Sequence, residues 1–421
     1  MNSSTRELAL PATARRLSWQ ARFAREQIFR RIRKLPRGRL VIEDADGVYR
    51  FGSGDERSDL VAQVFVVNEA FYHELASGGS IGAAESWVHG HWRTNDLLKV
   101  MQLMAVNIEL LNTLDDSSSV LQRLALRMLH ALNRNNVPGS RRNIEAHYDL
   151  GNELFAQFLD PGMMYSAAIF PRADASLEEA SRCKLERICR KLELKSTDHL
   201  LEIGTGWGGM AEYAARHFGC RVTTTTISRQ QHDYATRRIR DAGLEERVTV
   251  LLSDYRELEG QYDKLVSIEM VEAVGHRFLA RYFASCARLL KADGLMLLQS
   301  ILMPDQRYRR ARRNVDFIQR FIFPGGFLPS SSALIGHAGE HTDMQLLDTL
   351  DITAHYADTL AEWRRRFHRN GDAIRALGYG DDFMRLWDYY FSYCEGGFRE
   401  RAVGTAQFLF AKPLYRAPAA R

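Results

Sequence analysis

The feature that most constrains this chain is a short apolar strand that runs into a glycine-rich turn and then a helix. The strand is expected at residues 199–203, and the turn at 204–209 reads GTGWGG. Strand and helix signals alternate after it, with further strands expected at 221–227, 248–252, 264–268 and 294–301. Repeated strand–helix units of this length predict an α/β fold with a doubly wound, mostly parallel sheet. A late apolar stretch at 407–412 is expected to close the edge of that sheet.

Length and composition exclude several other classes of protein. The chain has 421 residues, enough for two domains with sizeable cores, and its 45% hydrophobic and 26% charged residues exclude a disordered or collagen-like chain. The five cysteines form no CxxC pair, which argues against a disulfide scaffold or zinc ribbon and favours a cytoplasmic location. No apolar run approaches the roughly 20 residues that span a bilayer, so we do not expect an integral membrane protein.

The first part of the chain is expected to form a smaller α+β domain over residues 1–120, with its boundary inside 115–138. Its most unusual segment is 15–39, which carries ten Arg or Lys residues against the single acid Glu26, with apolar residues between them. This basic arm has two open interpretations, an arm attracted to anionic phospholipid or a solvated helix face. Nucleic acid is the weaker alternative, and we expect no nucleic-acid partner.

The glycine-rich turn offers backbone N–H groups at a helix N-terminus to a ligand, as dinucleotide and S-adenosylmethionine sites do. Glu202, in the preceding strand, favours S-adenosylmethionine because it can meet a cationic amino group and would repel a pyrophosphate. No basic residue stands in the turn to offset that repulsion. A glycine-rich turn without a ligand is the alternative.

The ends of the next two strands supply candidate contacts to the nucleoside. Thr226 and Gln231 follow the second strand and could hydrogen bond the ribose. The alternative is a helix capping box made by Ser228 and Gln231, and Gln231 cannot serve fully in both roles. Asp254 and Tyr255, after the third strand, are placed to flank an adenine, although an aromatic residue there can also be simple packing.

Several further motifs recur in order along the chain. They read HYDLGNELF (147–155), LDP (159–161), MYS (164–166), TIS (226–228), DYR (254–256), SIEMVEAVGH (267–276) and FPGG (323–326). Together with the glycine-rich turn they closely resemble the cyclopropane-fatty-acyl-phospholipid synthases, including the mycolic-acid cyclopropane synthases. The resemblance covers about residues 144–412, with a looser fit over 66–92.

This resemblance implies a Rossmann-like class I methyltransferase domain over residues 121–421 with a mostly parallel seven-stranded sheet. It implies transfer of the methyl carbon of S-adenosylmethionine to the double bond of an unsaturated acyl chain in a membrane phospholipid, giving a cyclopropane through a carbocation. The enzyme would act from the cytoplasm at the inner membrane surface, alone or as a homodimer. The residues expected to bind the methyl donor are Tyr165, Ser166, Glu202, Gly204, Gly206, Trp207, Gly208, Thr226, Gln231, Asp254 and Tyr255.

A site for such a carbocation needs aromatic rings and one base. Tyr148, Tyr165, Phe323 and Tyr356 match aromatic positions that line the site in the family. The base in the family is a bound bicarbonate, held by a glutamate and by neighbours that include a cysteine, a histidine and a tyrosine. Glu272 matches that glutamate and Tyr356 matches the tyrosine.

Two positions depart from the pattern that the family shows at the bicarbonate. Ala167 replaces the cysteine and Gln299 replaces the histidine, while Ile268 falls where a backbone contact to the anion is expected. Gln can donate a hydrogen bond to an oxyanion and Ala cannot, so we expect a weakened or rebuilt bicarbonate site, with Glu272 itself as an alternative base. An altered proton transfer leaves a methyl-branched or methylene product open. A non-catalytic lipid-binding relative and a methyltransferase of small soluble substrates are remoter alternatives.

Three other patterns carry weaker interpretations. Residues 337–341 read HAGEH, the order found in inverted zincins, but two glycines weaken a helix there and no metal is expected. His89 and His91 could also pair on a metal, although a histidine-bearing turn is the simpler interpretation. Residues 307–320 are rich in arginine, and an amphipathic helix there would either lie on a bilayer or be a solvated face. Its apolar side would consist of Tyr308, Val315, Phe317 and Ile318.

Overall fold

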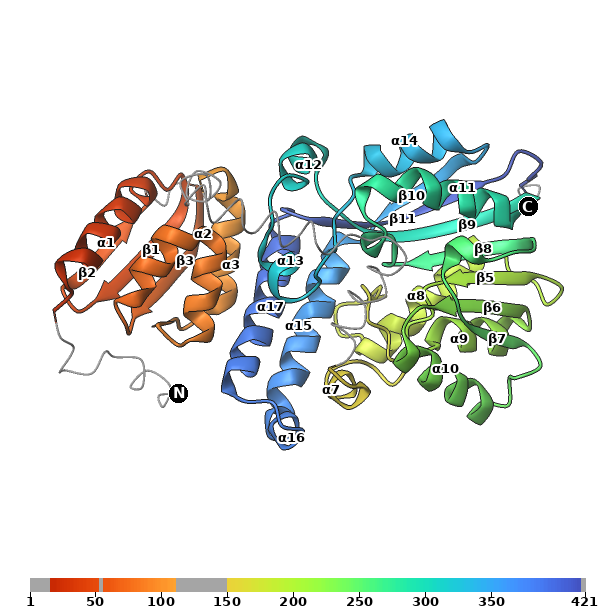
Figure 1. The fold of residues 1–421 in the computed structure, drawn as a ribbon, viewed down its shortest axis with the longest axis horizontal. Helices are drawn as coiled ribbons and strands as arrows, with labels where there is room; N and C mark the ends of the chain where they lie inside the picture. Colours follow the sequence, from red (N-terminus) through yellow and green to blue (C-terminus); the bar gives the residue numbers. More distant parts are fainter. Residues whose placement is uncertain (1–15, 53–55, 111–149, 418–421) are drawn as a thin grey trace. The chain divides into compact units, whose positions relative to one another are not determined.

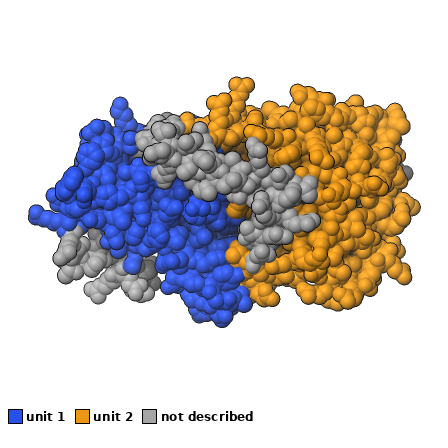
Figure 2. Space-filling view, viewed as in Figure 1, with its two compact units in different colours: residues 1–129, 314–322, 371–402 blue, residues 130–313, 323–370, 403–421 orange. Residues whose placement is uncertain are grey.

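The computed structural model describes residues 16–52, 56–110 and 150–417, and the chain divides into two compact units (Figure 2). Unit 1 comprises residues 1–129, 314–322 and 371–402. Unit 2 comprises residues 130–313, 323–370 and 403–421. Both units therefore combine segments that are far apart in the sequence. None of the described helices is long and apolar enough to cross a membrane.

Unit 2 is built on a seven-stranded sheet with the strand order β10-β11-β9-β8-β5-β6-β7 (Figure 1). The strands are β5 (His199–Ile203), β6 (Arg221–Thr226), β7 (Val248–Leu252), β8 (Tyr262–Ile268), β9 (Leu290–Leu302), β10 (Gln345–Asp351) and β11 (Gly404–Ala411). Neighbours from β7 through to β9 pair in parallel, whereas β11 runs antiparallel to both β9 and β10. The predicted doubly wound, mostly parallel sheet is confirmed.

The last strand differs from its expected place in the sheet. We expected the stretch near residue 407 at the sheet edge, but β11 lies inside the sheet, between β9 and β10. Its residues are almost all buried, as an interior strand requires. The edge strand next to β11 is β10, which reads QLLDTLD and has mostly exposed residues. Because its acidic and polar residues interrupt the apolar pattern, β10 carries little strand signal in the sequence.

Alternate residues of the central strands face two separate cores. On β9, Met296 and Leu298 join a core with helices α11 (Leu279–Leu289) and α14 (Ser331–His341). Leu295 and Leu297 join a core with helices α8 (Leu177–Lys191), α9 (Gly209–Phe218) and α10 (Arg229–Asp241). Figure 1 shows α9 and α10 along the β6–β7 part of the sheet. The helices of this unit are α7 (Asn152–Ala156), α8 (Leu177–Lys191), α9 (Gly209–Phe218), α10 (Arg229–Asp241), α11 (Leu279–Leu289), α12 (Asp305–Ala311), α14 (Ser331–His341) and α15 (Thr353–Arg369). Short 3₁₀ turns occur at η1 (Tyr255–Glu257), η2 (Val271–Ala273) and η3 (His276–Phe278).

Unit 1 is a smaller α+β unit with the strand order β2-β1-β3-β4. The strands are β1 (Arg37–Asp44), β2 (Gly47–Phe51), β3 (Glu56–Val66) and β4 (Trp92–Arg93). The helices are α1 (Trp19–Ile32), α2 (Ala70–Val88), α3 (Leu97–Val106), α13 (Phe317–Phe321), α16 (Gly371–Ala376) and α17 (Asp381–Arg399). Its core includes Phe29, whose ring lies 4.8 Å from those of both Tyr49 and Phe51.

Two late segments belong to unit 1, although a division at residue 120 assigns them to the methyltransferase domain. Helix α17 lies so close to α3 that a Cβ on Gly396 would come within 2.8 Å of the Cβ of Met101. The ring of Phe317 in α13 lies 4.8 Å from that of Tyr389 in α17. Such packing between distant segments leaves no local signal in the sequence. The expected boundary at 115–138 itself lies outside the described residues.

The arginine-rich segment 307–320 does not form the single amphipathic helix that we expected. Helix α12 ends at Ala311, and α13 begins six residues later after a new N-cap at Asp316. Phe317 is only 1% exposed and packs against Tyr389 and Tyr393. The interpretation of one helix lying on a bilayer through Phe317 is therefore wrong, because that ring belongs to the interior of unit 1.

Candidate active site

The glycine-rich turn leads directly from β5 into α9. Gly204, Gly206 and Gly208 have φ values of 104°, 52° and 85°, a region that residues with a Cβ rarely occupy. The hydroxyl groups of Thr205 and Thr224 hydrogen bond at 2.7 Å and hold the turn against β6. The N-cap residue of α9 is Gly208, which has no side chain to cap the first amides of the helix. These N–H groups therefore remain available to an anionic group of a ligand.

Glu202 lies in β5, immediately before the turn, and is only 3% exposed. Its Oε2 atom is buried without a hydrogen-bond partner among the described residues. Burial raises the pKa of this carboxyl group to about 8, although a hydrogen bond from Thr224 acts in the opposite direction. A cationic group would stabilise the ionised form. The site thus fits the amino group of S-adenosylmethionine, which Glu202 and the turn would hold.

Thr226 and Gln231, the two residues predicted to contact the ribose, lie side by side and hydrogen bond to each other. The hydroxyl of Thr226 donates to Oε1 of Gln231 at 2.9 Å and accepts the backbone N–H of Ser228 at 3.1 Å. The Ser228 hydroxyl accepts the N–H of Gln231 and caps α10. The N-cap half of the proposed capping box is therefore present. The Gln231 side chain turns to Thr226, which keeps both groups at the end of β6.

Asp254 and Tyr255 follow β7, as expected, and each already has partners. Asp254 accepts hydrogen bonds from Arg256 at Nε (2.7 Å) and at the backbone N–H (3.0 Å). Burial acts to raise the pKa of Asp254, but the bonds from Arg256 hold it below its usual value. The ring of Tyr255 packs edge-on against Tyr282, with 5.5 Å between centroids. A nucleoside at this point would share Asp254 with Arg256.

Several predicted aromatic residues meet in one cluster around Tyr165. Its ring lies 6.3 Å from that of Phe323 and 6.5 Å from that of Trp207. Trp363 of α15 lies 5.2 Å from Tyr165 and 6.2 Å from Tyr356, and so connects the two tyrosines. The sequence analysis missed Trp363, because an apolar residue on a helix face has no distinguishing signal. Tyr148 lies outside the described residues.

A carboxylate that received no role in the sequence analysis lies beside this aromatic cluster. Glu269 follows β8 and accepts hydrogen bonds from Gln299 Nε2 (2.9 Å), from the Ala167 N–H (2.9 Å) and from the Tyr356 hydroxyl (2.7 Å). Its side chain is partly buried, whereas Gln299 is fully buried and Tyr356 is 6% exposed. Burial raises the pKa of Glu269, and these three bonds oppose that effect, together with the charge of Lys184.

Glu272 lies three residues after Glu269, in η2. Its Oε1 atom accepts hydrogen bonds from the Ser300 hydroxyl at 2.9 Å and from the Ile301 N–H at 2.6 Å. Its Oε2 atom is buried without a partner among the described residues. Burial, and then the charge of Glu269, raise the pKa of Glu272 to about 8. Ile268, where a backbone contact to the anion was expected, is the last residue of β8.

A buried lysine completes the polar part of the site. Lys184 lies on the inner face of α8, is fully buried, and donates from Nζ to the Ser166 hydroxyl at 2.6 Å. Burial lowers the pKa of Lys184 to about 8, and the charges of Glu269 and Asp160 act against that shift. The only available signal was a lysine within the apolar stripe of a helix. Ser166, expected at the methyl donor, is thus engaged by this lysine.

The inverted-zincin pattern lies at the end of α14. The rings of His337 and His341 stack at 5.5 Å, but the pair belongs to no group of three or more potential ligands among the described residues. Nδ1 of His337 is buried and has no hydrogen-bond partner among the residues that the structure describes. The two histidines thus have no described third ligand with which to hold zinc as a zincin does.

Comparisons with known proteins show the family to which the chain belongs. The model of the mycolic acid cyclopropane synthetase family matches residues 136–408. The chain is 36% identical to tuberculostearic acid methyltransferase UfaA1 of Mycobacterium tuberculosis over 88% of this chain and 86% of that protein. It is 37% identical to the cyclopropane-fatty-acyl-phospholipid synthase of Escherichia coli over 83% of this chain and 88% of that protein.

Solved structures give the same result. The cyclopropane synthase MmaA2 of M. tuberculosis is 28% identical and superposes with a TM-score of 0.61, covering 65% of this chain and 98% of that one. The mycolic acid cyclopropane synthase CmaA1, in complex with SAH and CTAB, gives a TM-score of 0.61 at 30% identity over the same shares. From the site and these comparisons together, the chain is an S-adenosylmethionine-dependent methyltransferase that belongs to the mycolic acid cyclopropane synthetase family.

Proposed function

We propose that this enzyme transfers the methyl carbon of S-adenosylmethionine to the double bond of an unsaturated acyl chain in a membrane phospholipid and forms a cyclopropane ring. The observation that carries the proposal is the position of Tyr356. Its ring belongs to the aromatic cluster of Tyr165 and Trp363, and its hydroxyl donates to the carboxylate of Glu269. Cation-stabilising rings and a proton acceptor therefore lie side by side, as the reaction requires.

The first step needs an electrophile and a site that tolerates positive charge. S-adenosylmethionine supplies an electrophilic methyl group, which an alkene attacks to leave a carbocation on the neighbouring acyl carbon. An aromatic face near such a cation contributes about 2 kcal/mol or more when water is excluded. Tyr165 and Phe323, with rings 6.3 Å apart, are the residues that we assign to this role. Glu202, in β5 immediately before the glycine-rich turn, would hold the amino group of the methyl donor.

The second step removes a proton. A C–H bond of the transferred methyl group breaks, its electron pair closes the three-membered ring, and the proton passes to a base. Glu269 and Glu272 are the carboxyl groups that this region of the site provides. General-base catalysis of this kind typically contributes about 10²–10⁴-fold in rate.

A methylene product is the second candidate. Ala167 and Gln299 replace the cysteine and histidine that the family resemblance leads one to expect, so the proton acceptor is rearranged. One relative, at 36% identity, is named a tuberculostearic acid methyltransferase. A hydride can first shift between the two acyl carbons, which moves the positive charge to the carbon that carries the new methyl group. When the methyl proton then leaves, the electron pair forms a C=CH₂ double bond instead of a ring. A saturated methyl branch would then require a separate hydride donor.

The exposed face of α1 supports a membrane substrate. Trp19 and Phe23, four residues apart and so on one face, are 76% and 63% exposed. Other residues of the basic arm are used within unit 1, since Arg25 is buried and pairs with Asp44 at 3.0 Å. Exposed aromatic rings near cations are typical of helices that lie in a membrane interface. We propose that α1 binds the cytoplasmic surface of the inner membrane.

The test is product analysis. The purified enzyme is incubated with S-adenosylmethionine and vesicles of a monounsaturated phospholipid, and both S-adenosylhomocysteine and the fatty esters are measured. Ring and methylene products have the same mass, so proton NMR must separate ring methylene signals from vinylidene signals. Ring signals support the first proposal and vinylidene signals the second. If no S-adenosylhomocysteine forms, methyl transfer to this lipid class is excluded.

A further inference from the structure

The donors that a bicarbonate would need are already in use within this chain. The Tyr356 hydroxyl, the Gln299 amide and the Ala167 N–H all donate to one carboxylate, that of Glu269. Ala167 has no side-chain donor to offer in addition. A bicarbonate at this position would have to displace Glu269 and would meet a like charge. The residues present therefore do not fit a bound bicarbonate.

We infer that the Glu269 carboxylate takes the place of the bicarbonate and is the base that removes the proton from the transferred methyl group. This inference rests on the proposed function. The methyl C–H bond breaks, its electron pair forms the new carbon–carbon bond, and the proton binds a Glu269 oxygen. The acyl chain loses its positive charge and Glu269 loses its negative charge, so the step is balanced without a further reactant.

The surroundings of Glu269 favour an ionised carboxylate more than those of Glu272. Glu269 accepts three hydrogen bonds and feels the positive charge of Lys184. Glu272 leaves Oε2 without a partner among the described residues, and the charge of Glu269 raises its pKa further. The like charge of Glu269 also disfavours ionisation of Glu272, so the three hydrogen bonds make Glu269 the better placed of the two carboxyl groups to accept a proton.

The backbone conformation of Glu269 allows a glycine to replace it, which gives a direct test of the inference. Glu269 has a φ of 48°, in the left-handed region where glycine is favoured and a larger residue is uncommon. A Glu269→Gly variant therefore relieves backbone strain and removes the carboxylate to which Tyr356, Gln299 and the Ala167 N–H donate. The isosteric Glu269→Gln variant is its matched control, because it removes the charge but still fills the space.

The experiment measures turnover in bicarbonate-depleted buffer and with added bicarbonate. We expect the wild type to change less than twofold. Both variants should lose about 100-fold or more, within the usual range for a general base. Added bicarbonate should restore Glu269→Gly at least tenfold and leave Glu269→Gln unchanged. Calorimetric affinity for S-adenosylhomocysteine should stay within threefold in both variants, which separates loss of the base from loss of the fold.

Contrary outcomes are equally clear. The inference is overturned if the wild type loses tenfold or more without bicarbonate, or if Glu269→Gln keeps wild-type turnover. If the glycine variant does not fold, the wild-type response and the Gln variant still decide. If the wild type forms S-adenosylhomocysteine only when bicarbonate is present, this inference is wrong and the proposed function still stands. A wild type that forms none with unsaturated phospholipid removes both.

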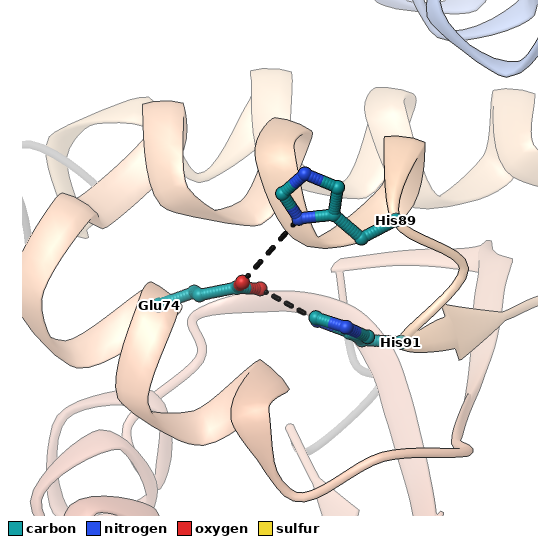
Figure 3. A group of neighbouring side chains, drawn as sticks. All are labelled: Glu74, His89 and His91. Carbon is teal, nitrogen blue, oxygen red and sulfur yellow. Dashed lines mark hydrogen bonds and ion pairs between the residues drawn. The ribbon is translucent and has the colours of Figure 1, made fainter. Parts of the chain in front are cut away.

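A separate observation in unit 1 carries a second inference. Glu74, His89 and His91 each offer a ligand atom, and these atoms lie within 4.8 Å of one another (Figure 3). Nδ1 of His91 is 2.9 Å from one carboxylate oxygen of Glu74, and Nδ1 of His89 is 3.5 Å from the other. No other group of three or more such side chains occurs within residues 16–52, 56–110 and 150–417.

A fold-back in α2 creates this group. Glu74 and the C-cap residue His89 are separated by 15 positions, which in a straight helix would be about 22 Å. The helix breaks at Gly79, with φ 58° and ψ −135°, and its two halves return against each other. A Cβ on Gly82 would lie 1.9 Å from the Glu74 carbonyl oxygen, so the halves are in direct contact.

We propose that Glu74, His89 and His91 form a site for a divalent transition metal such as Zn²⁺, with water in the remaining position. Two neutral imidazoles and one carboxylate are a common ligand set for zinc. The ion would bind the imidazole nitrogen lone pairs and join the two halves of α2 to the turn before β4. This proposal is independent of the catalytic one.

The test is a Zn²⁺ titration of the untagged, chelator-treated full chain against a competing chromophoric chelator. We expect one equivalent to bind, and His91→Gln or Glu74→Gln to weaken binding at least tenfold. The control is His217→Gln, an exposed histidine in α9 of unit 2, which should leave the affinity unchanged. No bound zinc in the wild type, or equal affinity in His91→Gln, would show that Glu74 only pairs with histidines and would overturn the proposal.

Discussion

Glu202 is a single carboxyl group whose charge no other group neutralises within residues 16–52, 56–110 and 150–417. With a pKa near 8 in the folded chain, against an ordinary value near 4.5, it is mostly protonated at pH 7. A ligand ammonium group favours the ionised form, so binding of S-adenosylhomocysteine should release about one proton between pH 5 and 7.5. Above about pH 9 the release should disappear, because the free group is then already ionised.

Calorimetry in buffers of different ionisation enthalpy measures this proton release. Glu202→Gln should abolish it and weaken binding at least tenfold, since the amide cannot offset the ligand charge. The same number of released protons in the wild type and in Glu202→Gln would contradict the assignment of Glu202 to the amino group.

At the same scale, Glu269 shows why individual roles are difficult to predict from sequence. Its hydrogen-bond donors are 102, 30 and 87 positions away along the chain, at Ala167, Gln299 and Tyr356. The motif SIEMVEAVGH drew attention to Glu272, and nothing local distinguishes the two glutamates. Lys184 was missed for the same reason, because its contact with Ser166 depends on how α8 packs. Glu272, Gln299 and Tyr356 were predicted as site residues only through the family resemblance.

Among the elements, α9 depends on a glycine at its first position. A Cβ on Gly209 would lie 2.6 Å from the Gly162 carbonyl oxygen and 2.8 Å from Sδ of Met164. Gly209→Ala should therefore destabilise the protein by about 1–3 kcal/mol, because neither backbone nor packed side chain can move freely. The matched control is Gly339→Ala within α14, where a Cβ would meet no described atom within 4 Å.

The control variant should gain about 0.5–1 kcal/mol, since alanine is favoured over glycine in a helix. Denaturant unfolding of both variants, compared at equal m-values, is the measurement. A shift of the two midpoints in the same direction would show that the tight contact at Gly209 does not govern stability.

Helix α1 carries the membrane prediction. The double substitution Trp19→Ser and Phe23→Ser should weaken binding to anionic phospholipid vesicles at least tenfold and leave the melting temperature nearly unchanged, because both rings are more than half exposed. Leu414→Ser, an equally exposed apolar residue in unit 2, is the control and should not affect vesicle binding. The vesicle binding that remains in the double variant should depend on the basic side chains of the arm, so raised salt should weaken it. Undiminished sedimentation of the double variant with vesicles would remove α1 from the membrane interface.

Elements were more predictable than residues. Strands β5, β6 and β7 lie within one residue of their expected bounds, because short runs of apolar and β-branched residues between glycine or polar breaks indicate a strand locally. Strand β10 was not predicted, since its exposed, acidic sequence does not look like a strand. The place of β11 inside the sheet could not be read locally either, because sheet order depends on which strands pair.

For the whole molecule, unit 1 depends on residues that the chain adds late. Glu400 pairs with Arg57 and accepts a hydrogen bond from Gln102 at 2.7 Å, and α17 lies against α3. A fragment of residues 1–129 would leave these surfaces uncovered. We expect it to lack a cooperative thermal transition and near-ultraviolet circular dichroism, whereas the full chain shows both. A fragment that melts sharply would show that unit 1 needs neither late segment.

The interior position of β11 has a consequence for synthesis on the ribosome. Strands β9 and β10 have nothing to join them until residues 404–411 have been translated, although the glycine-rich turn emerged some two hundred residues earlier. Until then the backbone edges of β9 and β10 that β11 covers stay open to other nascent chains. A premature stop codon even shortly before residue 404 would therefore yield an aggregating polypeptide rather than a slightly shortened enzyme.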